Sequence, residues 1–292
     1  MTRLQLLTTV ALISCLSGPE AEGQLLFDWP LRAAPQPEAI LTGAGAVFWN
    51  PGSLVPEVGT TREILIIHVD GPDVTGVGGV AFSGVVELPI GLQGGFGYRH
   101  LGTGGIPRTT NSPHQEIGDV DVSEDAVIFA LAGSIAGQTG VGGGISVQRG
   151  AAGIETKSRI EGEIGVHHQS TLPWAPRIGF VIKGLGGTLR PQGGAEVSLP
   201  PLASARVPIH LGYGIQADRS LKPVDHRVSL RGSWMDQLHL GMGFSYLGKG
   251  NGWTPLWMLG AKVGRYSVSV LRESLANGFG AVHFFQAAVR FP

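Results

Sequence analysis

The chain has 292 residues, a formal net charge of −1 and 15% charged residues, against roughly 25% in typical soluble domains. Near-neutral charge without any Lys/Arg-rich run excludes an electrostatic nucleic-acid binder, and the 42% hydrophobic content excludes a disordered chain. With 47 glycines, about twice the usual share, and a mean hydropathy of +0.17, the composition also disfavours an ordinary soluble enzyme.

Residues 1–23 have the pattern of a secretory signal peptide. Arg3 supplies a positive start, the apolar run LQLLTTVALISCLSG follows, and Ala21-Glu22-Gly23 offers a small-residue cleavage site. The apolar run is shorter than the roughly 20 residues that a spanning helix needs. Cys15 lies in a stretch that also resembles a lipobox, so its lipidation is an alternative. Because Cys15 is the only cysteine, the mature exported chain is predicted to have no disulfide.

Residues 24–58 precede the first expected strand and contain the stretch AVFWNPGSL (46–54). Proline lacks an N–H and restrains the preceding residue to an extended conformation, so this stretch forms a stiff corner. Two interpretations are open: a surface β-turn, or a segment packed inside something hollow. The residues concerned are Phe48, Trp49, Asn50, Pro51 and Gly52.

Residues 59–292 alternate with period two. In LHLGMGFSYLG (238–248), Leu, Met and aromatic side chains share one face, and His, Gly and Ser share the other. Turn sequences rich in Gly, Asn and Pro separate such runs. We expect about 12–14 strands of about 9–12 residues, longer than in most globular proteins and typical of membrane-spanning strands. They start near residues 61, 77, 91, 126, 141, 159, 176, 207, 226, 237, 256, 264 and 280.

Two segments, the polar stretch 102–124 and the Pro-rich stretch 190–206, lack this alternation. Both are predicted to be long loops on the extracellular side of a barrel. The alternative fold is an exported soluble β-sandwich that binds a ligand or surface, which would place its charged residues outward.

The polar face of the alternating segments consists mainly of Gly, Ser and His with isolated charges, which favours a barrel lumen over a solvated exterior. The sequence therefore predicts an all-β fold, an antiparallel transmembrane β-barrel. The polar residues predicted to face its lumen are Arg99, Glu161, Glu163, His167, Arg177, Lys183, His210, Arg227, Arg231 and His239.

The chain ends in the alternating strand AVHFFQAAVRFP, in which Phe285, Val289 and Phe291 share one face. An aromatic residue next to the end resembles the last strand of bacterial outer-membrane barrels, although the trailing Pro292 departs from that pattern. We therefore expect the protein in the bacterial outer membrane, with membrane lipid and the barrel-assembly machinery as partners.

GAGAVFWNPGSL (43–54) resembles the opening motif of the FadL/PorV-like outer-membrane barrels, including the PorV/PorQ group linked to type IX secretion. That motif has Trp or Tyr followed by Asn-Pro-Ala-Gly-Leu; Asn50 and Pro51 match, and Gly52 replaces Ala. EIGVHHQ…RIGFVIKGLGG, SLPPLASARVPIHLGYG and HRVSLRGSW…LHLGMGFSY resemble later elements of the family. The resemblance covers nearly the whole mature chain, which is short for the 14-strand family.

The resemblance implies that residues 24–58 fold into the lumen as a hatch. A barrel of about 14 strands is too wide to be filled by its own side chains, and irregular backbone is tolerated at membrane depth only inside protein. The plug interpretation is thus favoured over the surface turn. The resemblance also implies either passage of small hydrophobic compounds or a role in protein export with secretion-machinery partners.

A transporter should have a lateral opening, a Gly or Pro kink in one strand, and an apolar pocket next to the hatch. The candidate kink sites could equally be spacers that face the lumen. They are Gly95, Gly97, Gly142, Gly143, Gly144, Gly241 and Gly243.

No catalytic or metal-binding motif is found. The glycine-rich stretches lack the GK[ST] ending of a phosphate loop. His167 and His168 are adjacent in a strand and face opposite sides, so they do not bind one ion without a bulge. His239 and Ser245 share a face but lie too far apart for a catalytic pair. Cross-strand pairs of His239 with Ser229 or Ser233 stay open, but the sequence identifies no acid that would orient the histidine. We expect no enzyme, no cofactor and no metal.

Overall fold

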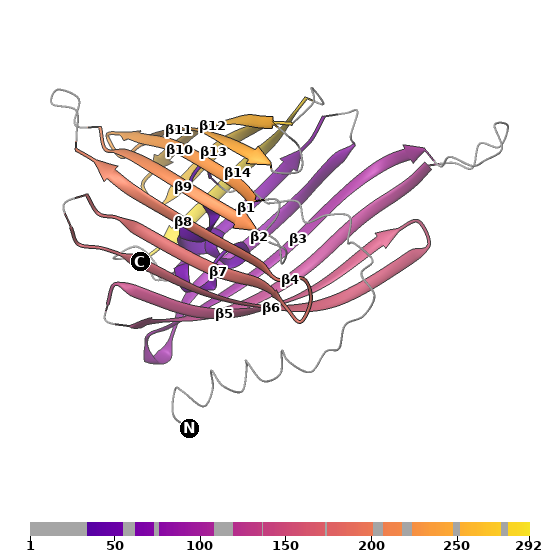
Figure 1. Ribbon diagram of the computed structural model, residues 1–292, viewed down its shortest axis with the longest axis horizontal. Helices are drawn as coiled ribbons and strands as arrows, with labels where there is room; N and C mark the ends of the chain where they lie inside the picture. The colour runs from indigo at the N-terminus through magenta and orange to yellow at the C-terminus, as the bar shows by residue number, and fades with distance from the viewer. Residues whose placement is uncertain are drawn as a thin grey trace.

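The computed structural model describes residues 34–54, 62–72, 76–107, 119–135, 137–172, 174–200, 207–217, 224–247, 252–275 and 280–292. The predicted signal peptide, 1–23, lies outside these residues. The described part of the chain contains fourteen strands in one closed barrel, in which each strand pairs with its neighbours in sequence and β1 pairs with β14 (Figure 1). No helix among the described residues is long and apolar enough to span a membrane.

The strands are β1 (Arg62–Asp70), β2 (Val77–Leu88), β3 (Leu92–Pro107), β4 (Asp119–Ile135), β5 (Thr139–Ala152), β6 (Glu155–Gln169), β7 (Arg177–Leu185), β8 (Arg190–Leu199), β9 (Ile209–Ala217), β10 (Val224–Trp234), β11 (Leu238–Leu247), β12 (Gly252–Val263), β13 (Tyr266–Ser274) and β14 (Ala281–Phe291).

Every strand pair is antiparallel, and the seam between β1 and β14 runs from Arg62 opposite Phe291 to Asp70 opposite His283. The single closed sheet confirms the predicted all-β barrel at the upper end of the expected strand number. It also excludes the β-sandwich, because no edge strand is left among the described residues. We refer to the end where β1 begins and β14 ends as the terminal end, and to the opposite end as the far end.

The predicted loop at 190–206 is wrong, because residues 190–199 form β8. Pro191 is tolerated as the second residue of this strand, opposite Ile182, and two glycines opposite β7 and β9 weaken its hydrophobic pattern. β8 ends and β9 begins at the terminal end. The prediction for 102–124 is also partly wrong, since β3 continues to Pro107 and β4 begins at Asp119.

The outer wall carries a belt of exposed large apolar side chains. Strands β3 to β6 have 16, 17, 14 and 15 residues and stand taller than the rest of the wall at the far end (Figure 1). Apolar side chains can face outward in this number only if lipid covers them. Members of the belt, one from each strand except β8, are Ile66, Phe82, Phe96, Phe129, Val147, Ile164, Phe180, Leu211, Val228, Leu240, Trp257, Val268 and Phe285.

Aromatic rings border this belt at both ends. Exposed rings at the terminal end are Trp174, Trp234 and Tyr266. At the far end Trp253 is exposed, and the half-buried rings of Tyr246 and His226 lie next to it. Along β10, eight residues separate Trp234 from His226, which is about 20 Å of barrel height at ~3.3 Å per residue and ~40° tilt. That height is close to the ~25 Å apolar band of outer-membrane barrels.

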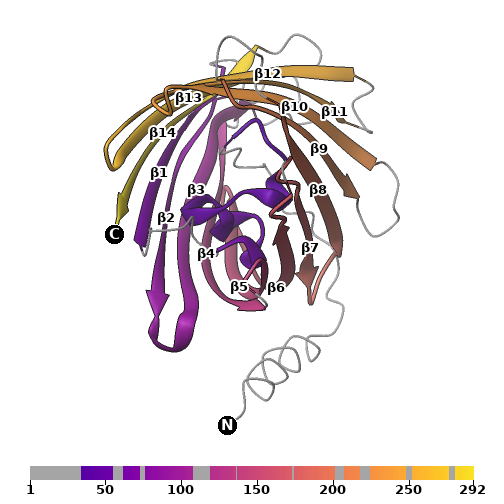
Figure 2. The same cartoon turned by 90° about the vertical axis from the view of Figure 1, so that its left-hand side faces the viewer.

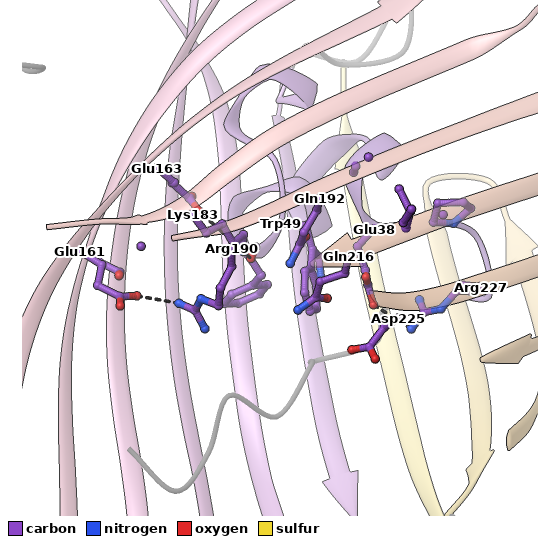
Figure 3. A pocket seen from close by; sticks show the side chains of 18 of the residues that line it. Glu38, Trp49, Glu161, Glu163, Lys183, Arg190, Gln192, Gln216, Asp225 and Arg227 are labelled. Carbon is purple, nitrogen blue, oxygen red and sulfur yellow. Dashed lines mark hydrogen bonds and ion pairs between the residues drawn. The ribbon is translucent and has the colours of Figure 1, made fainter. Parts of the chain in front are cut away.

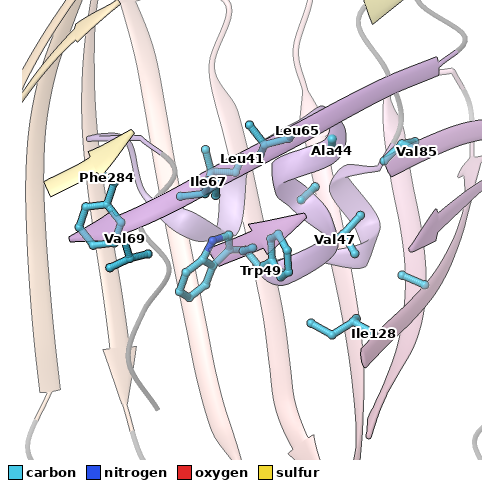
Figure 4. Close-up of a cluster of buried hydrophobic side chains, with 14 of the residues drawn as sticks. Leu41, Ala44, Val47, Trp49, Leu65, Ile67, Val69, Val85, Ile128 and Phe284 are labelled. Atoms are coloured by element: carbon cyan, nitrogen blue, oxygen red, sulfur yellow. The ribbon is translucent and has the colours of Figure 1, made fainter. Parts of the chain in front are cut away.

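Residues 34–54, which we name the plug, lie inside the barrel as three short 3-10 helices (Figure 2). These are η1 (Glu38–Ile40), η2 (Gly43–Phe48) and η3 (Pro51–Ser53); a fourth, η4 (Pro89–Gly91), makes the turn between β2 and β3. Apolar plug residues pack with inward-facing side chains of β1, β2, β4 and β14 into one buried cluster (Figure 4). Its members include Leu41, Ala44, Val47, Trp49, Leu65, Ile67, Val69, Val85, Ile128 and Phe284.

Candidate functional site: the plug and the lumenal cavity

Glycines of the inner wall allow the plug to approach the strand backbones. A Cβ atom at Gly165 would lie 1.9 Å from Asn50 Oδ1, and one at Gly179 would lie 1.9 Å from the carbonyl oxygen of Ala39. No other residue type fits at such distances, so these positions require glycine. The inward glycines whose Cβ would likewise come within 3 Å of the plug are Gly95, Gly97, Gly142, Gly194, Gly212, Gly214 and Gly241.

None of the glycines proposed as strand kinks lies at a break in the ladder. Pairing is continuous at Gly95 and Gly97 of β3, at 142–144 of β5, and at Gly241 and Gly243 of β11. Most of them act instead as close-packing positions on the inner wall, while Gly143 faces outward. The continuous pairing gives no support to a kink at these residues.

The Asn50–Pro51 corner ties the plug together and to the wall. Asn50 is fully buried, and its Nδ2 donates to the carbonyl oxygens of Ala39 (2.6 Å) and Val166 (3.1 Å). Its Oδ1 accepts from the N–H of Gly52 (2.9 Å) and so caps η3. One amide side chain thus joins η1, η3 and strand β6, which accounts for Asn at the stiff corner.

Two wall cations hold the plug electrostatically. Arg227 Nη2 lies 2.8 Å from Glu38 Oε1, and both side chains are largely buried, at 7% and 12% exposure. Lys183 Nζ donates to the carbonyl oxygen of Phe48 and lies 4.8 Å from the ring centroid of Trp49. These contacts place positive charge against the plug on the side that faces β7 and β10.

A cavity of about 260 Å³ lies between the plug and the far end (Figure 3). Its floor includes Phe48 and Trp49 of the plug. Its walls include Arg190 and Asp225, which stand at the beginning of β8 and β10, both of which start at the far end. The cavity therefore has an aromatic floor and polar walls.

The charges around this cavity are paired. Arg190 lies 2.8 Å from Glu161, and Lys183 lies 3.5 Å from Glu163. Arg99 pairs with Glu124 at 2.5 Å. The walls thus present hydrogen-bonding groups without a strong local excess of either sign, which suits a neutral compound better than an ion.

Gln192 supplies a polar atom that a bound molecule can satisfy. Its side chain lines the cavity, the residue is 5% exposed, and its Oε1 has no hydrogen-bond partner among the described residues. A water molecule, or a donor group on a bound molecule, can hydrogen-bond to this acceptor. This glutamine belongs to β8 and was missed at the sequence level together with the whole strand.

A β-bulge interrupts the cavity wall between β6 and β7. Gly162 pairs with Leu185 and Glu163 pairs with Lys183, so Gly184 is the extra residue. Its φ of +75° is a conformation that favours glycine, and a Cβ there would lie 2.0 Å from the carbonyl oxygen of Thr188. The irregular ladder is thus located beside the cavity.

The ten predicted lumen residues all lie on inward strand faces, but in two groups. Arg99, Glu161, Glu163, Lys183 and Arg227 line the cavity. The other five lie nearer the terminal end, on the other side of the plug; they are His167, Arg177, His210, Arg231 and His239.

The second group is organised by a carboxylate that the sequence analysis did not include. Glu196 of β8 accepts two hydrogen bonds from Arg231, at 2.8 and 2.6 Å, while His210 Nδ1 lies 3.0 Å from Ser198 Oγ. Alternation with outward Ala195 and Val197 is the signal that could have identified Glu196.

These features together define the class of protein. A closed barrel with an apolar belt, aromatic rings at both borders and a filled lumen is an integral β-barrel of the bacterial outer membrane. The sequence matches no family model and no curated protein.

Solved structures with the same fold are FadL-family outer-membrane barrels. The toluene transporter TbuX of Ralstonia pickettii superposes with a TM-score of 0.58 at 12% identity, covering 86% of this chain and 94% of TbuX. The Pseudomonas putida toluene transporter TodX gives 0.53 at 10% identity, covering 87% and 94%. A Pseudomonas aeruginosa FadL homologue gives 0.52 at 8% identity, covering 87% and 93%. At such identities the likeness shows the fold; a PorV/PorQ-type relationship stays a prediction.

Proposed function

We propose that this barrel is a channel through which small hydrophobic compounds cross the outer membrane, with the plug as its hatch. The observation that carries the proposal is the cavity whose floor includes Phe48 and Trp49 of the plug itself. A molecule bound there touches the segment that closes the lumen. Binding and opening would then act on the same residues.

The cavity size supports a small compound. An engineered apolar cavity of about 150 Å³ holds one benzene molecule, so a space of about 260 Å³ accommodates a substituted single ring. TbuX and TodX, which share the fold, are named as toluene transporters. The bulge at Gly184 is the kind of strand irregularity expected beside a lateral opening.

We also infer that the barrel has no catalytic role. Ser245, which shares a strand face with His239, accepts a hydrogen bond from Arg227 Nε at 3.3 Å. In β10 the residue opposite His239 is Ser233, so His239 is not placed beside Ser245. Arginine does not act as the general base that an activated serine needs. A type IX secretion-like role stays a prediction.

Uptake of labelled toluene by intact cells tests the channel. Whole cells are needed because toluene crosses plain phospholipid bilayers unaided, whereas a lipopolysaccharide leaflet slows it. We expect cells with the barrel to take up toluene several-fold faster than cells without it. Trp49→Ala should change this rate at least twofold because it removes the aromatic floor.

Trp257→Ala is the matched control, since Trp257 belongs to the outer belt and faces lipid. Its uptake should equal that of the unmodified barrel. Uptake no faster than in cells without the barrel, with the protein present and heat-modifiable on SDS gels, would refute the channel. Equal effects of the two tryptophan changes would refute the placement of the ligand on the plug.

A further inference from the structure

An apolar groove of about 850 Å³ runs across the outer wall from β1 to β5. Its floor includes Gly84, Gly94 and Gly143, which leave the strand backbones uncovered on their outward faces. The ladders between β1 and β5 are continuous at these glycines, so the groove lies on the membrane side of an unbroken wall. It is separate from the lumenal cavity.

A row of three phenyl rings forms one side of this outer-wall groove. The ring centroids of Phe82 and Phe96 lie 6.4 Å apart, and those of Phe96 and Phe129 lie 5.4 Å apart. Ile64, Leu131 and further aliphatic side chains complete the lining. The shape and the apolar lining of the outer-wall groove fit a long apolar chain.

The groove ends at a guanidinium at the terminal end. Arg62, the first residue of β1, lines it together with Phe291, and the side chain of Arg62 makes no hydrogen bond or ion pair among the described residues. Arg265 lies 5.6 Å from the ring centroid of Phe291, which brings a second cation to this rim. The site therefore combines an apolar floor with positive charge at one end.

The position of Arg62 along the barrel axis shows which leaflet of the membrane faces the cationic end of the groove. Outer-membrane barrels have their chain ends and short turns on the periplasmic side. Here β1 begins and β14 ends at the terminal end, which also carries the short turns 89–91, 235–237 and 264–265. The exposed rings of Trp234 and Tyr266 mark the headgroup level there. The leaflet on that side of an outer membrane consists of phospholipids.

We propose that the outer-wall groove binds one phospholipid of the periplasmic leaflet. An acyl chain lies along the Phe82–Phe96–Phe129 row, and the phosphate accepts hydrogen bonds from Arg62. This site is independent of the channel function, because neither the lumen nor the plug takes part.

The test is native mass spectrometry of the delipidated full-length barrel in mild detergent, titrated with palmitoyl-oleoyl phosphatidylglycerol. We expect one tightly bound lipid per barrel. Gly84→Leu combined with Gly143→Leu fills the groove; the nearest atoms to the new Cβ positions are at 3.7 and 3.6 Å, so the barrel tolerates both. This variant should bind at least tenfold more weakly.

Gly78→Leu is the matched control, because Gly78 lies on the same strand and face, outside the groove, with its nearest neighbour at 3.6 Å. It should bind like the unmodified barrel. Arg62→Gln, and the unmodified barrel with palmitoyl-oleoyl glycerol, which lacks the phosphate, should each show binding about tenfold weaker.

Equal binding by the groove-filled variant and the control would overturn the site, and equal binding of the phosphate-free lipid would overturn the role of Arg62. If the double variant fails the heat-modifiability check, the Arg62→Gln comparison still decides: an unchanged affinity rejects the proposal.

Discussion

Replacing Gly165 with alanine places a methyl group where the plug needs empty space. The new Cβ would lie 1.9 Å from Asn50 Oδ1, over 1 Å closer than the 3.0 Å that real Cβ atoms essentially never undercut. Asn50 is fully buried, so its side chain must withdraw as a whole from strand β6. It then loses its hydrogen bonds to the carbonyl oxygens of Ala39 and Val166.

The magnitude follows from these contacts. Overpacking costs about 1–3 kcal/mol, and each lost hydrogen bond costs about 1 kcal/mol, so the seated plug is destabilised by about 3–5 kcal/mol. Since 1.4 kcal/mol corresponds to a factor of ten, the unseated population rises by between about 100-fold and a few thousand-fold.

Hydrogen–deuterium exchange of the peptide covering 46–54 measures this change, because the N–H of Gly52 is protected by its bond to Asn50 Oδ1 at 2.9 Å. Gly143→Ala is the control; its Cβ meets nothing closer than 3.6 Å and should leave exchange unchanged. Exchange in Gly165→Ala within threefold of the unmodified barrel would refute the account of the glycine-lined wall.

Three further changes test other contacts. Arg227→Met removes the guanidinium that lies 2.8 Å from the buried carboxylate of Glu38 and should destabilise η1 by about 3 kcal/mol, seen as faster amide exchange at 38–41 with exchange at 50–54 less affected. Ser83→Ala removes the 2.8 Å bond to the carbonyl oxygen of Ala44 and should cost about 1 kcal/mol; unchanged exchange in η2 would contradict that contact. Phe291→Ala should at least halve the heat-modifiable folded fraction in outer-membrane extracts, because it removes the aromatic ring that ends the closing strand; an undiminished fraction would count against its role in assembly.

The regular barrel strands could be predicted because lipid and lumen impose opposite chemistry on alternate residues. Leu240 and Phe244 face lipid, while Gly241 and Ser245 of the same strand face inward, so period two is visible in the sequence itself. Strand β8 escaped this reasoning because its outward positions include Pro191 and a glycine, which carry no apolar signal. The polar inward residues of β8 were therefore not predicted either.

The plug could be predicted only as a stiff corner. Pro51 and its neighbours fix the local backbone, but the partners of Asn50 lie 11 and 116 residues away, in η1 and β6. No periodicity links such distant positions. Likewise, the sequence shows the high glycine content but not its cause. The cause is the close approach of plug atoms to particular strand residues, which only the structure gives.

The seam between β1 and β14 sets an order of assembly. The plug precedes β1 in the chain, yet inward glycines from β3 to β11 enclose it with no room for an extra methyl group. A wall that had already closed would not admit this segment past its own side chains. We therefore expect the plug to be seated before Arg62 pairs with Phe291, and this pairing requires the last strand of the chain.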